Sequence, residues 1–431
     1  MPAAVVGNGH EKAQCRRGAR REVLTKMVSK GLRATGAASS TVRIGALYGA
    51  LFLAIGMMMP LLPVWLAARG LTDAVIGQVQ AGQSLARVVA QPLVAHVADA
   101  SGRMRLVMLA SALASVAALA WLGVGSGEVA IFTGVVMAAF FFSPLVPLTE
   151  SVAVREGARL GVAYGRLRLW GSLTFVLGAV LAGISLDALP AAMLVWALVA
   201  AQGLVVASIA LQPEWLMDGP ARAAAAVAGR GSRRTLLSGA FLLFLLVAGL
   251  IQASHALLYG FASLHWQRLG HSGVVIGALV ATGVLAEVAL FWFSGPVMER
   301  IGAVRLMMLA AAAGVARWAG MAFDPPLAGL FALQALHGLT FGAAHLGAVA
   351  YVRTRAPARL AATGQAMYSA VSMGLFMTVA MWASGRLYAA HGARAWLAMA
   401  AMTLAALVLG FALRRVSPPP ARPTGRRKAA A

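Results

Sequence analysis

The chain alternates between long apolar segments and short polar turns. Twelve segments reach the roughly 20 apolar residues that a membrane-spanning helix needs. We predict spans at approximately 44–66, 74–97, 106–125, 129–152, 165–186, 190–211, 236–262, 273–296, 306–323, 327–350, 364–388 and 395–413. The pattern predicts an all-α membrane protein with two six-helix bundles, 43–211 and 236–413, joined by a linker over 212–235. A basic arm (1–42) and a tail (414–431) are expected to be disordered and cytoplasmic.

One segment of the chain is repeated. Residues Leu71 to Ser111 recur 200 positions later as His271 to Ala311, with 14 of 41 residues identical and no gap. Two parallel copies of one helical unit are typical of transporters and predict pseudo-symmetric halves. Where the first copy carries Arg87, the second carries Glu287. Charges deep in apolar segments usually face a water-filled cavity or a partner, so both are candidate functional residues. The alternative is an Arg–Glu pair that only joins two helices.

Composition narrows the class of protein. With 60% hydrophobic and 11% charged residues, the chain is not expected to be soluble. The net charge of +23 lies in short loops and tails, which is the positive-inside pattern; it predicts that both termini are cytoplasmic and disfavours nucleic-acid binding. The single Cys15 argues against an intrachain disulfide or a cysteine metal cluster. Without a phosphate-binding glycine loop or metal-ligand spacing, we expect neither an enzyme nor a cofactor.

The turn after the second predicted span carries a recognisable motif. Asp99-Ala-Ser-Gly102-Arg103-Met-Arg105 resembles the acidic-x-x-Gly-Arg-x-Arg turn of the major facilitator superfamily, and the pair Glu299-Arg300 repeats part of it in the second half. The family usually has Gly where this chain has Ala95. The resemblance implies a facilitator fold that works by alternating access. It assigns gating to these residues, because an acid and basic side chains meet at a helix end.

Longer strings resemble one branch of that superfamily, the phenylpropionate permease family. They include FFFSPLVPLTES (140–151), YGRLRLWGS (164–172), HALLYGFASLHWQRLG (255–270) and LHGLTFGAAHLGA (336–348). The resemblance implies proton-coupled uptake of 3-phenylpropionate or a similar aromatic acid across a bacterial inner membrane, by a protein that works as a monomer. Related branches carry sugars and nucleosides. Proton-coupled sugar or nucleoside symport, drug/proton antiport, and a sensor or scaffold without transport therefore stay open.

Proton coupling requires a titratable group inside the membrane. Glu287 lies midway along the eighth predicted span and is the first candidate. His337 and His345, eight positions apart on the tenth span, face the same way and are candidate proton relays, although packing explains them equally well. Together with Arg317 on the ninth span, Glu287 and a histidine resemble the cluster of lactose-permease-like symporters. There, the cluster serves sugar binding and proton coupling.

Substrate recognition calls for a cation and aromatic side chains. Arg87 and Arg317 are the candidates for a carboxylate, because a guanidinium donates two parallel hydrogen bonds to it. Trp170 and Tyr259, with His255 one helical turn before Tyr259, are the candidates for the aromatic part. At the cytoplasmic mouth, a Glu150–Arg166 pair is expected to act as a gate. The alternative is a solvated ion pair without consequence.

Overall fold

The computed structural model describes residues 40–160, 164–218, 236–357 and 360–417, nearly all of them helical. A first helix, Ser40–Ala68, precedes α2. The first part of the chain then forms α2 (Asp73–Ser101), α3 (Met104–Val124), α4 (Glu128–Phe142), α5 (Leu145–Leu160), α6 (Tyr164–Ala188), α7 (Leu194–Ala210) and α8 (Glu214–Met217). The second part forms α10 (Gly239–Ala253), α11 (Ala256–Arg268), α12 (Gly273–Trp292), α13 (Ser294–Ile301), α14 (Ala303–Met321), α15 (Leu327–Ala335), α16 (Ala344–Arg355), α17 (Ala361–Met367), α18 (Phe376–His391) and α19 (Trp396–Val416).

Within the described ranges, ten helical segments are long and apolar enough to cross a membrane. This count does not confirm the twelve predicted spans, for two physical reasons. The helix α2 has 29 residues, but its four glutamines and its charges make it too polar to be counted. The last segment, Thr363–Val416, counts once with its 54 residues, although α18 ends at His391 and α19 begins at Trp396, after a turn at Gly392 whose φ is 54°. It therefore covers the eleventh and twelfth predicted spans together.

Several predicted boundaries were wrong. The first helix begins at Ser40, inside the predicted arm, and α19 continues to Val416, inside the predicted tail. The predicted linker begins with the short helix α8, and its remaining residues 219–235 lie outside the described ranges, as do 1–39 of the arm and 418–431 of the tail. The prediction stopped helices where apolar residues end, whereas a helix continues as long as its backbone is hydrogen-bonded.

The sequence repeat has a counterpart in the backbone. Thr72 and Ser272, 200 positions apart, both cap a helix N-terminus, each accepting a hydrogen bond from the backbone N–H three residues later. Gly70 and Gly270, and likewise Gly102 and Gly302, have positive φ angles of 81°, 84°, 67° and 80°. Glycine adopts this conformation without a steric penalty, so the two copies turn at the same places.

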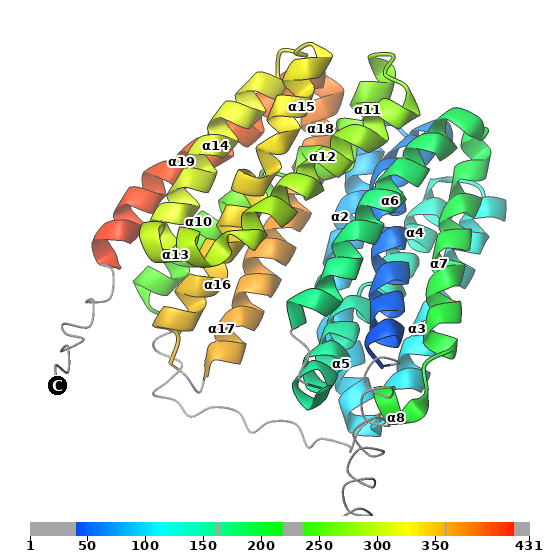
Figure 1. The fold of residues 1–431 in the computed structure, drawn as a ribbon. Helices are drawn as coiled ribbons and strands as arrows, with labels where there is room; N and C mark the ends of the chain where they lie inside the picture. Colours follow the sequence, from blue (N-terminus) through cyan, green and yellow to red (C-terminus); the bar gives the residue numbers. More distant parts are fainter. Residues whose placement is uncertain (1–39, 161–163, 219–235, 358–359, 418–431) are drawn as a thin grey trace, which may run out of the picture.

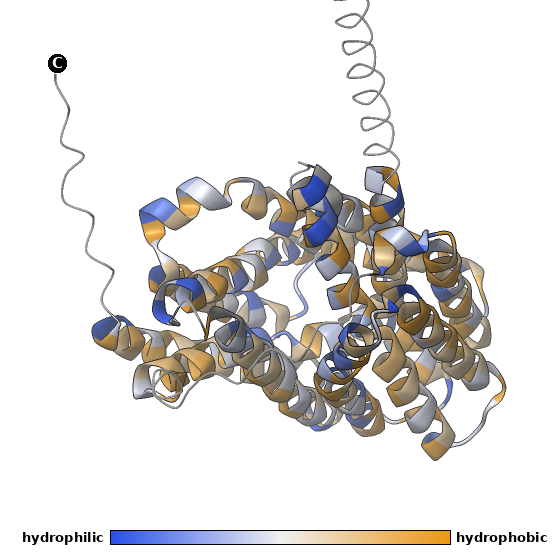
Figure 2. Ribbon diagram, turned by 90° about the horizontal axis from the view of Figure 1, so that it is seen from below, coloured by the Kyte–Doolittle hydropathy of each residue, from blue (hydrophilic) through white to orange (hydrophobic). Residues whose placement is uncertain are grey.

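The helices form two groups. Figure 1 shows α2 to α8 on one side and α10, α13, α14, α16, α17 and α19 on the other. The helix α12 packs against α6 and α18 against α2, which joins the groups. Seen from below, most of the helical ribbon is coloured as hydrophobic, with short hydrophilic stretches between (Figure 2). Many large hydrophobic side chains are exposed on these helices, among them Leu242, Val379 and Phe411. Such a surface suits a bilayer.

At one end of the molecule the groups meet very closely. A Cβ atom on Gly77 of α2 would lie 2.6 Å from the Cα atom of Gly385 on α18, and one on Gly273 of α12 would collide with the carbonyl of Gly183 on α6. Only glycine permits such a backbone approach between helices. The Figure 1 view shows α5 and α17, at the opposite end, far apart. The structure therefore closes one end of the space between the groups.

Two carboxylates of the first part of the chain fasten the closed end. Asp73 accepts two hydrogen bonds from the guanidinium of Arg268, at 2.9 and 2.8 Å. Asp187 accepts from the backbone N–H groups of Gly273 and Val274, at 2.6 and 2.9 Å, and so caps the N-terminus of α12. These contacts, which we call the carboxylate latch, were not predicted from the sequence.

We expect weakening of the carboxylate latch to open this end more often. In a Cys15→Ser background with the cavity probe Met58→Cys, the double variant Asp73→Asn, Asp187→Asn should be labelled faster by a membrane-impermeant thiol reagent added on the latch side. An exposed ion pair contributes up to about 1 kcal/mol, so each lost contact should speed labelling up to about fivefold. Asp324→Asn is the matched control, because Asp324 lies at the same end but bonds His265 of its own half. Equal labelling rates in the double variant and the control would contradict a latch.

Candidate substrate cavity

A cavity of about 740 Å³ lies between the two groups of helices. Its wall is contributed by the first helix, α2 and α6 on one side and by α11, α12 and α18 with their neighbouring turns on the other. The volume lies within the range of about 300–1,000 Å³ that is common for small-molecule sites. Because both groups contribute to the wall, a bound molecule would contact both.

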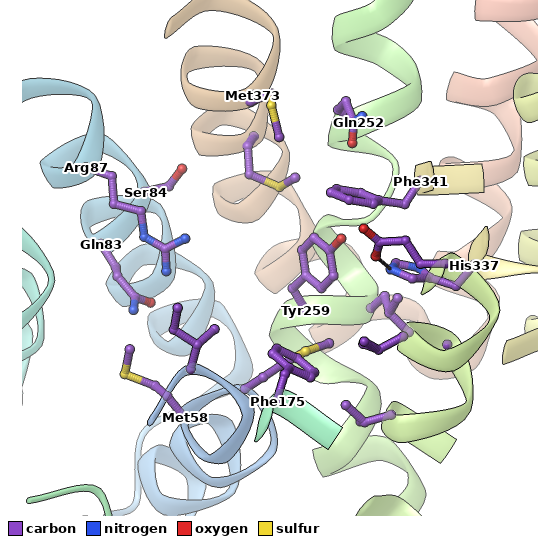
Figure 3. Close-up of a pocket in the computed structure, with 18 of the residues that line it drawn as sticks. Met58, Gln83, Ser84, Arg87, Phe175, Gln252, Tyr259, His337, Phe341 and Met373 are labelled. Carbon is purple, nitrogen blue, oxygen red and sulfur yellow. Dashed lines mark ion pairs between the residues drawn. The ribbon is translucent and has the colours of Figure 1, made fainter. Parts of the chain in front are cut away.

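One wall carries an arginine. Arg87 of α2 points into the cavity beside Gln83 and Ser84 (Figure 3). Among the described residues, the guanidinium of Arg87 has no hydrogen-bond or ion-pair partner, and its side chain is exposed to the cavity. A guanidinium in contact with water in a narrow cavity is free to bind an anion.

The opposite wall carries an acid and a histidine. Glu287 of α12 lies 4.0 Å from His337, measured between Oε2 and Nε2, and both line the cavity together with Tyr259 (Figure 3). His337 immediately precedes a π-helical turn, η2 (Gly338–Ala343). A Cβ on Gly338 would lie 2.6 Å from the carbonyl oxygen of Ala286. The absence of a side chain at Gly338 lets the turn press against α12, and this brings His337 next to Glu287.

A buried arginine lies behind His337. Arg317 of α14 is completely buried. Its Nη1 lies 3.0 Å from His337 Nδ1 and donates to the hydroxyl of Thr340 at 2.8 Å, while Nη2 donates to Oε1 of Gln334 at 2.8 Å. The guanidinium also stacks over the ring of Trp318, 4.5 Å from its centroid. Arg317 is therefore held by neutral groups and does not itself line the cavity.

The remainder of the wall is largely apolar. Phe175 and Met58 come from the first group of helices, and Phe341 and Met373 from the second (Figure 3). Aromatic rings and thioether sulfurs both make favourable contacts with an aromatic ligand. The cavity thus combines a cation on one side, an acid on the other and an apolar, partly aromatic interior.

A family model supports the fold and the class of protein. The model of the MFS_1-like family matches residues 41–398. The chain belongs to this family, and with it to the major facilitator superfamily. It is a multi-pass membrane protein and not an enzyme, since the relatives described below are transporters or permeases.

Two curated relatives are similar to this facilitator over most of their length. A probable 3-phenylpropionic acid transporter of Escherichia coli (strain K12) is 32% identical over 84% of this chain and 95% of its own. A maltose permease of Geobacillus stearothermophilus is 30% identical over 79% and 86%.

Solved structures share the fold at lower identity. The nucleoside transporter NupG has a TM-score of 0.74 at 15% identity, with 87% of this chain and 98% of its own covered. An auto-inhibited POT family peptide transporter has a TM-score of 0.69 at 14% identity, covering 91% and 99%. These similarities extend to the fold.

The structure places four of the predicted site residues on the cavity wall: Arg87, Tyr259, Glu287 and His337. Three others lie behind it. Arg317 and His255 are completely buried, and His345 faces Tyr368, with 3.3 Å between Nδ1 and the hydroxyl. The expectation that Arg317 and His255 contact substrate directly does not agree with this placement.

Trp170 also lies away from the cavity. Its side chain is 53% exposed and its ring packs on Gly45 of the first helix, where a Cβ would lie 3.0 Å from Cδ1. The helix α6 is rotated so that Phe175, and not Trp170, faces inward. The prediction required Trp170 to line the cavity; in this structure it does not, whereas Phe175 of the same helix does.

The acid of the predicted gate at the other mouth pairs with a neighbouring arginine. Glu150 lies 3.0 Å from Arg168. The guanidinium of Arg168 lies 5.0 Å above the ring of Phe52, and Arg168 also lines the cavity. The side chain of Arg166 lies outside the described residues, so the Glu150–Arg166 pair stays a prediction.

The facilitator turn holds the short helix α8. Arg105 donates its backbone N–H to Asp218 at 2.8 Å and its guanidinium to the carbonyl of Ala210 at 2.7 Å and to Glu214 at 3.5 Å. Gly102 follows the end of α2 with a φ of 67°, and Arg103 is the N-cap of α3. The side chains of the remaining predicted gate residues are exposed: Asp99, Arg103, Glu299 and Arg300. Gating by these residues stays a prediction.

The sequence analysis did not identify the glutamines and the threonine whose side chains hydrogen-bond around the cavity. Gln80 donates to the carbonyl of Gly260 at 2.8 Å, and Gln334 and Thr340 hold Arg317. The sequence does contain a sign of these residues, because an amide side chain buried in an apolar helix needs a hydrogen-bond partner. The chain offers many such residues, and their partners depend on which helices are neighbours.

The two candidate arginines should respond differently to removal. Arg317→Met leaves Gln334 and Thr340 without their buried donor, at about 1–3 kcal/mol for each unsatisfied group, so thermal unfolding should occur several degrees lower. The matched variant Arg87→Met removes a cation without a described partner and should leave the unfolding temperature unchanged. Thermal unfolding of the detergent-solubilised proteins, followed by tryptophan fluorescence, provides the measurement. Equal losses of stability in both variants would show that Arg87 is also structurally paired.

Proposed function

We propose that this facilitator takes up a small aromatic carboxylate, such as 3-phenylpropionate, by proton-coupled symport. The observation that carries the proposal is that the guanidinium of Arg87, which has no partner among the described residues, shares a largely apolar cavity with Glu287. In this mechanism Arg87 binds the carboxylate of the substrate through charge-assisted hydrogen bonds, and Glu287 carries the proton. Phe175 and Phe341 contact the aromatic ring.

The charges explain why a proton has to accompany the substrate. A monoanion that enters a cell with a membrane potential of about 100 mV, negative inside, is opposed by about 2.3 kcal/mol. One proton on Glu287 cancels the charge of the substrate. The cation and the acid lie on different groups of helices, so loading of both sites changes the electrostatic attraction between the groups. That change supports alternating access around this cavity.

The proposal includes the architecture expected from the sequence. We infer twelve spans in two six-helix halves, 40–211 and 236–416 once the observed helix ends at Ser40 and Val416 are included, with both termini cytoplasmic in a bacterial inner membrane and a monomer as the working unit. The helix α2 counts as a span, because 29 residues extend about 43 Å and its glutamines line the cavity. The carboxylate latch then lies on the outer side, and the cavity is closed toward the outside.

A sugar is the second candidate substrate, and the cavity itself favours it in one respect. Gln80, Gln83, Gln91 and Gln252 all line the wall, and amides donate to and accept from hydroxyl groups. The similarity to a maltose permease agrees with this candidate. It predicts recognition without any need for a carboxylate, so the role of Arg87 separates the two.

The first experiment measures uptake of radiolabelled 3-phenylpropionate and of maltose into inside-alkaline proteoliposomes, with and without a protonophore. We expect concentrative uptake of the acid, abolished by the protonophore. Arg87→Gln should raise the KM for the acid at least about tenfold, because a charge-assisted hydrogen bond contributes about 1.5–3 kcal/mol. The amide of 3-phenylpropionate, which lacks the charge, is the matched substrate control. Uptake of maltose but not of the acid, unaffected by Arg87→Gln, would overturn the proposal in favour of a sugar.

Proton coupling should depend on Glu287. In the variant Glu287→Gln the side chain keeps its size but no longer gives up a proton, so uptake driven by a pH gradient should fall to the level of passive equilibration. Exchange of labelled for unlabelled substrate, which needs no net proton movement, should continue. Glu128→Gln is the control, since Glu128 is an exposed acid in the first turn of α4 and does not line the cavity. If Glu287→Gln still concentrates substrate, the proton travels elsewhere.

A further inference from the structure

The ring of His337 has two different neighbours. Nδ1 lies 3.0 Å from Nη1 of Arg317, and Nε2 faces Oε2 of Glu287 at 4.0 Å. A guanidinium nitrogen is only a donor, so Nδ1 has to be the acceptor and therefore carries no proton. The single proton of a neutral ring is then on Nε2, which points toward Glu287.

Neutral side chains fix the arginine that imposes this arrangement. Thr340 and Gln334 each accept a hydrogen bond of 2.8 Å from a different Nη atom of Arg317. Trp318 stacks on the guanidinium and is itself held by a hydrogen bond from its Nε1 to Ser254 at 3.0 Å. Because the planar guanidinium is held on two sides and one face, the direction of its third contact, to His337, is also fixed.

The protonation of a second histidine, His255, agrees with this hydrogen-bond arrangement. Nδ1 of His255 lies 3.1 Å from the carbonyl of Ile251 and 3.2 Å from that of Gln252, so it has to donate. Nε2 of His255 is then an acceptor and receives the hydroxyl hydrogen of Thr340 at 3.1 Å. The hydrogen bonds that run from the Nη atoms of Arg317 through Thr340 to His255 therefore all have one consistent donor direction, while Nε of Arg317 has no partner among the described residues. An extra proton on His255 or on Nδ1 of His337 would break the chain of hydrogen bonds.

We propose that Thr340 and Gln334 are positioning residues that hold Arg317 so that His337 remains a singly protonated donor to Glu287 and does not itself carry the transported proton. This inference rests on the proposed role of Glu287. The groups that face the ring of His337 are Arg317, Glu287, His255 at 5.4 Å between ring centroids and Tyr259 at 6.4 Å. A second proton on His337 would set two cations in direct contact in a buried place.

The arrangement gives Glu287 two distinct states. At 4.0 Å the carboxylate and Nε2 are too far apart for a hydrogen bond, and an approach of about 1 Å would form one. An ionised Glu287 is then stabilised by the N–H of His337 and the charge of Arg317 behind it. A protonated Glu287 is neutral, so it is no longer held by the N–H of His337 or by the charge of Arg317 and is free to turn into the cavity. His337 thus changes its hydrogen bond without changing its own protonation.

The test reads the tautomer directly. The protein is labelled with ¹⁵N-histidine and reconstituted in lipid nanodiscs, and the His337 signals are assigned by comparison with His337→Asn. We expect the Nε2–H tautomer to persist from about pH 5 to pH 8, the range in which an ordinary histidine titrates. A doubly protonated ring or an Nδ1–H tautomer in this range would overturn the proposal. No substrate is needed, so this result is independent of whether the protein transports an aromatic acid.

Matched variants test the two positioning residues. In Thr340→Val and in Gln334→Leu, Arg317 is released, and we expect the ring of His337 to titrate or to populate both tautomers. Thr340→Ser keeps the hydroxyl and should behave as the unmodified protein. Thr403→Val is the control for loss of a buried threonine, because its hydroxyl bonds only carbonyls of its own helix. An unchanged tautomer in both test variants would contradict the positioning role. If these variants do not fold, Thr340→Ser and the unmodified protein still decide the tautomer.

Transport kinetics provide a second measurement, which would not change in the expected way if Thr340 only stabilised the fold. Thr340→Val should lower the maximal rate of proton-driven uptake by at least about tenfold, the effect of losing one buried partner, with the KM within about twofold, because Arg87 is untouched. Its pH profile should also lose activity toward acid pH, where a second proton on His337 competes with Glu287. A raised KM with an unchanged pH profile would instead indicate a distorted cavity.

Discussion

The interior of this facilitator has to hold a positive charge at a depth where the surrounding lipid offers no hydrogen bonds. Arg317 is completely buried, and the protein replaces water around it with an amide, a hydroxyl, an imidazole nitrogen and an aromatic face. Neutral acceptors bind both terminal nitrogens of this guanidinium but leave its charge in place, and its Nε has no partner among the described residues. The charge therefore acts outward, through His337, on the one acid of the described cavity wall. Much of the site follows from this single placement.

The same constraint explains why Arg87 is left without a described partner. A cation that borders a cavity of about 740 Å³ is hydrated when the cavity is empty, so it needs no protein acceptor. A ligand carboxylate can then replace that water. Arg87 and Arg317 are thus alike in residue type and depth but opposite in environment. The buried one organises the hydrogen bonds of the wall, and the hydrated one remains available to an anion.

The hydrophobic pattern predicted the helical segments, the repeat drew attention to Arg87 and Glu287, and the resemblance of the turn motif and the longer strings implied the facilitator family. Two further residues named from the sequence, His337 and Tyr259, line the same cavity. These patterns could not predict how each helix is rotated about its own axis. The helix α6 is apolar on most sides, so its sequence gives no preference for turning Phe175 inward over Trp170. Contacts between distant segments, such as the carboxylate latch, depend on the packing of the two groups, which no local pattern specifies.

The repeat also shows how one duplicated unit acquires two roles. The copies share N-terminal caps, positive-φ glycines and close glycine contacts, so their helices begin and pack alike, although the second copy breaks at Phe293 where α2 continues. At the equivalent depth, however, α2 presents Arg87 and α12 presents Glu287 to the same cavity. Two identical cations or two identical acids would repel each other across the space between the groups. Opposite charges allow the groups to approach when the cavity is empty, and each can be neutralised separately, by an anion on one side and a proton on the other. The similar backbones of the two copies thus place the two sites at equivalent positions, and the opposite charges of Arg87 and Glu287 make these sites chemically different.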